Sequence, residues 1–275
     1  MATADAAPVP IFLDHVALAA DVAWDNFDRY RGDLGGEWNG GMHSPGFYWG
    51  QVRYANGMII EMLQPHDVHL DDFLRRFIDR SGDGPHHLTF KVPDIVAAMD
   101  AATAAGFPPV RSDLSQEFWK EAFLHPKQCH GIVVQLAQAA HHEWDEDVHH
   151  HVLPPSRCKR PATLDRIVHL VGDLDGALVL FRDVLGGAMQ TEVVDGVDGR
   201  SVELTWPGAG RLQLIQPTDG DLNEWLGDRP GRVHRIEFSL VDAGSVRGAA
   251  LIREDTFEID PLMNHGVRLR LREAR

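Results

Sequence analysis

Residues 87–138 read HLTFKVPDIVAAMDAATAAGFPPVRSDLSQEFWKEAFLHPKQCHGIVVQLAQ, and this stretch decides the fold. It opens with a short apolar run, continues with apolar residues at helical spacing between positions 95 and 102, and ends in short apolar segments. Its element order is strand, helix, then about three strands. Residues 15–65, from HVALAA to MIIEMLQP, have the same order, with a hairpin signal at positions 55–57. The sequence therefore predicts two successive copies of one unit.

Polar residues interrupt the apolar strands at matched places in the two copies. His15 lies 46 residues before Glu61, and His87 lies 48 residues before Gln135. A lone histidine on an apolar strand is more often a hydrogen-bonded core residue, but a repeated polar pattern needs a common explanation. Two imidazoles, one carboxylate and one amide oxygen would satisfy one another by sharing a divalent metal ion.

Composition limits the class of protein. The 275 residues are 44% hydrophobic and 24% charged, as in folded globular proteins. The formal net charge of −15 disfavours nucleic acid as a partner. Two cysteines are too few for a disulfide framework, and neither a membrane span nor a signal peptide is recognisable. We expect a cytoplasmic protein without membrane association.

The chain divides into a first domain at residues 11–138, a linker rich in histidine and proline at 139–161, and a second domain at 162–273. Three adjacent histidines at 149–151 are interpreted as part of a solvated loop. Apolar residues at helical spacing also predict helices over residues 70–78 and 174–185.

The second domain reads as a degenerate copy of the first. Alignment of the strand-like segments puts four residues, three of them arginines, where the first domain has its polar set; these are Arg166, Gln213, Arg235 and Arg270. Arginine does not ligate a cation. The arginines either form an anion pocket or pair with acids such as Glu203, Glu237 and Asp242. The short interval from Arg235 to Arg270 indicates that the last unit has lost a helix or a strand.

The segments LDHVALAA, FLRRFIDRSGDGPHHLTFKVPDI and FLHPKQCHGIVVQLAQ carry a family resemblance. The first half resembles the vicinal oxygen chelate superfamily, which includes glyoxalases, bleomycin resistance proteins and extradiol dioxygenases, and within it the methylmalonyl-CoA epimerases. The resemblance implies an α+β fold of two tandem domains, each built from paired βαβββ modules. It also implies His15, Glu61, His87 and Gln135 as ligands of one divalent ion, which could be Co, Ni, Mn, Zn or Fe.

Two departures from the family affect the chemistry that the resemblance implies. Gln135 stands where epimerases and glyoxalases have a glutamate, and an amide does not accept a proton at neutral pH. The segment around His43 and Ser44 has no carboxylate. The candidate bases are therefore Glu61, His43 and His86, with Glu117 and Glu121 as remoter candidates.

The expected function is that of a metal-dependent isomerase or lyase. It would chelate vicinal oxygens of a small carbonyl or carboxylate substrate and stabilise an enediolate. One alternative is a non-haem iron dioxygenase of the extradiol type, and another is a non-catalytic protein that binds a small molecule. The protein is expected to be a monomer or a homodimer.

Overall fold

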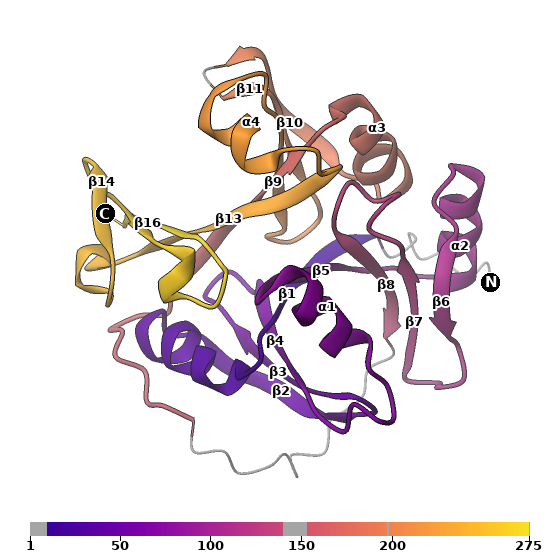
Figure 1. Ribbon diagram of the computed structural model, residues 1–275, viewed down its shortest axis with the longest axis horizontal. Helices are drawn as coiled ribbons and strands as arrows, with labels where there is room; N and C mark the ends of the chain where they lie inside the picture. The colour runs from indigo at the N-terminus through magenta and orange to yellow at the C-terminus, as the bar shows by residue number, and fades with distance from the viewer. Residues whose placement is uncertain (1–9, 140–152, 197, 275) are drawn as a thin grey trace, which may run out of the picture.

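The computed structural model describes residues 10–139, 153–196 and 198–274, and their strands form two sheets of eight strands each (Figure 1). The strand order is β2-β3-β4-β1-β5-β8-β7-β6 in the first sheet and β10-β11-β12-β9-β13-β16-β15-β14 in the second. In both sheets the first strands of two successive units pair in the middle. This arrangement confirms the predicted α+β fold of tandem paired modules.

The elements follow the predicted order of one strand, a helix and three strands. The first half contains β1 (Phe12–Ala19), η1 (Ala23–Asp25), η2 (Asp28–Asp33), β2 (Glu37–Ser44), β3 (Phe47–Arg53), β4 (Ile59–Pro65), α1 (Phe73–Ser81), β5 (Gly84–Lys91), α2 (Ile95–Ala104), β6 (Pro109–Asp113), β7 (Trp119–Leu124) and β8 (Val133–Ala139). The second half contains β9 (Thr163–Val171), α3 (Leu174–Leu178), η3 (Val179–Val184), β10 (Ala188–Gly196), β11 (Gly199–Thr205), β12 (Arg211–Gln216), α4 (Gly220–Leu226), β13 (Gly231–Leu240), η4 (Ala243–Ser245), β14 (Ala250–Arg253), β15 (Thr256–Ile259), η5 (Pro261–Met263) and β16 (Leu269–Glu273).

Helices α2 and α3, one in each half, begin in the same way, with an aspartate that caps the first turn. Asp94 accepts hydrogen bonds from the amides of Val96 and Ala97, at 2.9 and 3.1 Å, at the start of α2. Asp173 caps α3 in the same way through the amide of Gly176. These carboxylates satisfy amides that have no partner inside the helix. The helix predicted over residues 70–78 begins only at Phe73, because the preceding residues form a turn.

The short interval from Arg235 to Arg270 predicted that the last unit, β13 to β16, has lost a helix or a strand. The structure shows that it has lost the helix and keeps its four strands. A single 3₁₀ turn, η4, follows β13 where the other units have a helix. Asp242 begins this turn in the left-handed conformation at φ 61°. The Glu273 carboxylate accepts hydrogen bonds from the amides of Asp242 and Ala243 at 2.7 and 2.8 Å, and this closes the turn.

The two halves share one hydrophobic core and pack by matching contacts. Tyr54 after β3 packs on Phe238 of β13 with ring centroids 5.0 Å apart. Trp206 after β11, the equivalent of Tyr54, packs on Phe90 of β5 at 5.2 Å. The main cluster of buried residues draws on both sheets, and each sheet has a smaller cluster of its own beneath a helix. The halves therefore form one continuous interior.

Glycines allow a second pair of matching contacts between the halves. A Cβ on Gly131, before β8, would overlap the carbonyl of Gly231 at the start of β13. A Cβ on Gly266, before β16, would overlap the carbonyl of Asp83 before β5. Both Gly131 and Gly266 also have positive φ values, of 86° and 75°. In each half, a glycine turn thus lies in close backbone contact with the start of the central strand of the other half.

Part of the predicted linker, with all of its histidines, lies outside the described residues. Residues 153–162, which are described, contain no helix or strand. Arg157 in this segment pairs with Asp28 and Asp33 at 2.7 and 2.5 Å, and so fastens the segment to the first half. No helix within the described ranges is long and apolar enough to cross a membrane.

Candidate metal centre

The pairing of three strands brings His15, Glu61 and His87 together. In the register of the first sheet, Ala17 of β1 lies between Glu61 of β4 and His87 of β5. His15 is two residues before Ala17, so its side chain is on the same face of the sheet. We call this the inner face. Ala17 has only a methyl group there, which leaves room between the three longer side chains.

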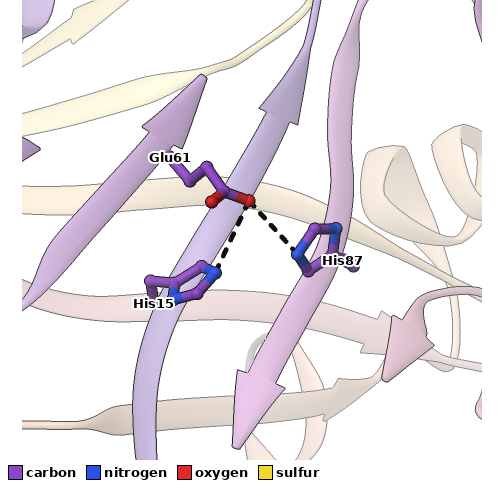
Figure 2. Close-up of side chains that lie close together, drawn as sticks. All are labelled: His15, Glu61 and His87. Atoms are coloured by element: carbon purple, nitrogen blue, oxygen red, sulfur yellow. Dashed lines mark ion pairs between the residues drawn. The ribbon is translucent and has the colours of Figure 1, made fainter. Parts of the chain in front are cut away.

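The three side chains converge on one point (Figure 2). Glu61 Oε2 lies 3.6 Å from His15 Nε2 and 3.4 Å from His87 Nε2. One ligand atom from each residue lies within 4.8 Å of the other two. His15, Glu61 and His87 are only 1, 8 and 5% exposed. Among the residues that the structure describes, this is the one group of three histidine, cysteine or acidic side chains with metal-site spacing.

A second set of side chains holds the three in place. His15 Nδ1 lies 2.8 Å from the Asp14 carboxylate, and Gln51 donates a hydrogen bond to Glu61 Oε1 at 2.9 Å. His87 Nδ1 lies 2.8 Å from Nδ1 of His86. These contacts leave Nε2 of both histidines and Oε2 of Glu61 facing the common point. Partners of this kind orient metal ligands and select their tautomers.

The charges of the site are arranged around Glu61. Burial by itself would lower the pKa of His15, but the carboxylates of Glu61 and Asp14 raise it to about 9. Burial would raise the pKa of Glu61, but His15 lowers it below its ordinary value. Burial, together with the nearby His86, holds the pKa of His87 well below its ordinary value. At neutral pH the site therefore contains an anionic Glu61, a cationic His15 and a neutral His87.

The donor set fits a divalent cation. His87 Nε2 is buried and makes no hydrogen bond to any described residue. A neutral imidazole with a free lone pair, aimed at a carboxylate oxygen and a second imidazole, is a ligand arrangement that Zn, Fe, Co, Ni and Mn accept. In the absence of a cation, protonated His15 compensates the buried charge of Glu61. A bound ion would displace that proton.

Comparisons with known proteins agree with this fold. Residues 14–123 match the family model described as Glyoxalase/Bleomycin resistance protein/Dioxygenase superfamily. The chain contains a domain of this superfamily. A triple mutant of 4-hydroxymandelate synthase from Streptomyces coelicolor matches the length of the chain, with 15% identity, a TM-score of 0.66, and 97% of this chain and 93% of the synthase covered.

Shorter solved structures match the chain over about half its length. Methylmalonyl-CoA epimerase in complex with methylmalonyl-CoA is 21% identical, covers 50% of this chain and 100% of its own, and has a TM-score of 0.43. The Mycobacterium tuberculosis epimerase is also 21% identical, over 47% of this chain and 89% of its own, with a TM-score of 0.43. No curated protein matches the chain.

Gln135 lies at the edge of the candidate centre in the glyoxalase-superfamily domain. Its side-chain oxygen accepts a hydrogen bond from Thr89 at 2.6 Å, and Thr89 Oγ1 is also 2.9 Å from His15 Nε2. Its amide nitrogen donates to Glu121 Oε2 at 2.7 Å. The amide oxygen is thus near the centre and already hydrogen-bonded. Its role as a fourth ligand stays a prediction.

The two histidines predicted as alternative bases occupy different places. His86 is buried at an irregularity in the β1–β5 pairing, against Phe77 of α1, and burial lowers its pKa to about 4. His43 pairs across β2 and β3 with Tyr48, three residues from Gln51. Because side chains alternate along a strand, His43 and Tyr48 lie on the face opposite to Gln51 and Glu61. Of the two, His86 adjoins the centre.

Salt bridges occupy the equivalent place in the second sheet. Val168 of β9 lies between Gln213 and Arg235, just as Ala17 lies between Glu61 and His87. This register agrees with the predicted alignment. Arg166 pairs with Glu203 and with Glu237, the latter at 3.4 Å, and Arg235 pairs with Glu237 at 2.6 Å. The predicted partner Asp242 pairs instead with Lys159, at 3.1 Å.

The sequence analysis missed Thr89 and Gln51, which support the site, although both left a signal. Thr89 is two residues after His87 and therefore shares its face of the strand. Gln51 and Glu61 are equally distant from Asn56 in the predicted hairpin, so their pairing could have been found. Glu121 was named only as a remoter candidate base, and its contact with Gln135 could not be predicted because it depends on the pairing of β7 with β8.

Proposed function

We propose that the protein is a metal-dependent isomerase or lyase of the glyoxalase and epimerase type. His15, Glu61 and His87 would hold one divalent ion, with Gln135 as a possible fourth ligand. The observation that carries the proposal is the convergence of three buried donor atoms on one point, with His87 Nε2 left without a hydrogen bond. The substrate would be a small molecule with two neighbouring oxygens, one of them a carbonyl.

When bound, the ion would supply Lewis-acid polarisation of a substrate carbonyl, which acidifies the neighbouring C–H. The residues of the chain then have distinct tasks. Asp14 and His86 hold the His15 and His87 rings through their Nδ1 atoms. Gln51 holds Glu61 by donating a hydrogen bond to Oε1, which leaves Oε2 facing the centre.

Glu61 is the proposed proton acceptor once substrate replaces its carboxylate on the ion, because this carboxylate is anionic at neutral pH and faces the centre. His86 is proposed as a positioning residue. At neutral pH it is uncharged, and it touches the centre only through His87. His43 takes no part in this proposal, since it lies on the other face of the sheet.

A non-haem iron dioxygenase is the second candidate. Two histidines and one carboxylate are the ligand set of non-haem Fe(II) oxygenases, and His15, His87 and Glu61 provide it. The two candidates differ in their requirement for oxygen. Oxygen consumption that depends on added Fe(II) would favour the dioxygenase, whereas anaerobic hydrogen–deuterium exchange of a substrate C–H would favour the isomerase or lyase.

Elemental analysis of the purified, untagged full chain tests the metal centre. We expect one equivalent of a divalent transition metal in the wild type and none in the variant His15→Ala with His87→Ala. The control variant, His66→Ala with His69→Ala, changes two histidines in the segment after β4 and should retain the metal. Wild-type protein that neither contains nor takes up a metal would overturn the proposal, as would metal retained by the variant that lacks both ligands.

A further inference from the structure

A pocket of about 600 Å³ lies in the second half of the chain, apart from the candidate metal centre. It is bounded by residues of α4, β13 and the connection from β15 to β16, and by one residue of the first half; these are Asp83, Trp225, Arg232, His234, Pro261, Leu262, Met263, His265 and Gly266. Helix α4 packs on Val168 and Leu170 of β9. Val168 is the equivalent of Ala17, so the pocket lies on the face of the second sheet that corresponds to the inner face of the first.

Arg232 carries the charge that this pocket presents. It is partly buried, and its guanidinium lies 4.5 Å from the centroid of the Trp225 ring. It forms no ion pair with a carboxylate among the described residues. Burial, together with the nearby Arg229, lowers its pKa, as expected for a cation without a neighbouring anion.

His234 adds a neutral hydrogen-bond donor. Its Nδ1 lies 3.0 Å from Arg235 Nη1, and a guanidinium can only donate, so His234 accepts this bond and carries its proton on Nε2. Burial and the surrounding arginines lower the pKa of His234 to about 3. The imidazole therefore stays uncharged at neutral pH.

Arginines outnumber glutamates in the ion pairs of the second sheet, and three of these arginines, Arg235, Arg268 and Arg270, act on His234. Five arginines pair with three glutamates; the pairs join Arg166, Arg211, Arg235, Arg268 and Arg270 to Glu203, Glu237 and Glu258. Nε of Arg268 and Nε of Arg270 are buried and lack an acceptor among the described residues.

The remaining lining is mostly apolar. Leu262 and Met263 beside the pocket are 96 and 58% exposed, so their side chains are accessible to a ligand. The carboxylate in the lining, Asp83, accepts hydrogen bonds from the amide of Asp21 at 3.1 Å and is 3.2 Å from His265 Nδ1. It is therefore already engaged at the edge of the pocket.

We propose that this pocket binds a small organic anion, in which a carboxylate or a phosphate is attached to a planar ring. Arg232 and His234 bind the anionic group, and the ring lies beside Trp225, Leu262 and Met263. Guanidinium groups form strong charge-assisted hydrogen bonds with both kinds of anion. This site is independent of the metal centre and of the reaction proposed for it.

Calorimetric titration of the full chain tests the proposal with benzoate, phenyl phosphate and neutral benzyl alcohol as probes. We expect one equivalent of benzoate or phenyl phosphate to bind, and benzyl alcohol to bind at least tenfold more weakly. The stronger of the two anions identifies a carboxylate or a phosphate site. Arg232→Gln should weaken anion binding at least tenfold, and Arg232→Lys should restore part of it.

Matched controls locate the binding. Arg253→Gln removes an exposed arginine of β14 outside the pocket lining and should change affinity less than twofold. His15→Ala with His87→Ala should also leave anion binding unchanged. If Arg232→Gln fails to fold, Met263→Asp at the exposed rim should weaken binding at least tenfold. The proposal would be overturned if neither anion binds, or if the metal-centre variant loses anion binding. It would also be overturned if Arg232→Gln, or Met263→Asp used in its place, binds as tightly as the wild type.

Discussion

A buried histidine between the two halves should make the stability of the protein depend on pH. His169 in β9 is fully buried, and its Nε2 lies 2.7 Å from the carbonyl oxygen of His130, to which it donates a hydrogen bond. Burial lowers its pKa from 6.5 to about 4. The unfolded chain therefore binds a proton at this position at a higher pH than the folded protein does. Its contribution to stability is complete above about pH 6.5 and is lost as the pH falls toward 4.

The size of the effect follows from the two pKa values. At pH 5 an unfolded histidine is almost fully protonated, whereas His169 in the folded protein is almost fully neutral. Between pH 8 and pH 5 the protein therefore loses roughly 2 kcal/mol of its free energy of unfolding. This is the span of about 1.5 pH units between pH 6.5 and pH 5, taken at about 1.4 kcal/mol per unit. At pH 4 the loss approaches about 3 kcal/mol by the same relation.

The assay is urea unfolding of the wild type and His169→Gln at several pH values between 4 and 8. Glutamine cannot take up a proton, and its amide can still donate to the His130 carbonyl. The free energy of unfolding of the variant should fall less steeply, so that the difference between the two proteins shrinks by about 2 kcal/mol from pH 8 to pH 5. Other buried histidines are present in both proteins and cancel. His69→Gln, at an exposed site, should match the wild-type slope. Parallel curves for wild type and His169→Gln would refute the reasoning.

Three further predictions concern the domain contact and the metal centre. Gly131→Ala should lower the free energy of unfolding in urea by at least about 2 kcal/mol more than Gly57→Ala does. Both glycines have positive φ, but only Gly131 faces a backbone carbonyl, so equal losses of stability would contradict the contact. Thr89→Val should destabilise the metal-free protein by about 1–3 kcal/mol, since Gln135 Oε1 and His15 Nε2 lose their shared partner, and an unchanged unfolding midpoint would count against this network. Removal of metal with a chelator should lower the melting temperature, and metal restored at 100 times its Kd should return about 2.7 kcal/mol, whereas an unaltered melting curve would argue against the centre.

Local sequence signals were enough for the element order and the main polar positions. The spacing of apolar residues predicted strand, helix and three strands in each unit. The 35-residue interval between Arg235 and Arg270 predicted the shortened last unit. These features are readable because side-chain periodicity and capping residues act over a few positions in the chain.

The supporting contacts depended on strand pairing and were harder to predict. Glu121 seemed remote from the site in the sequence, yet the pairing of β7 with β8 brings it to Gln135. His43 was a candidate base on residue type alone. Its place on the opposite face follows from the register of β2 and β3, which no local pattern specified.

The sequence by itself determined that the chain has two related halves, and that only the first carries the polar set His15, Glu61 and His87. The tertiary structure alone decided that these three meet, since β1 pairs with β4 on one side and with β5 on the other. It also decided that Arg232 and Trp225 share a pocket with Asp83 of the first half. The physical reason is that composition and periodicity are properties of neighbours in the chain. A site is instead made by residues that only sheet registry and packing of the two halves bring within a few ångströms.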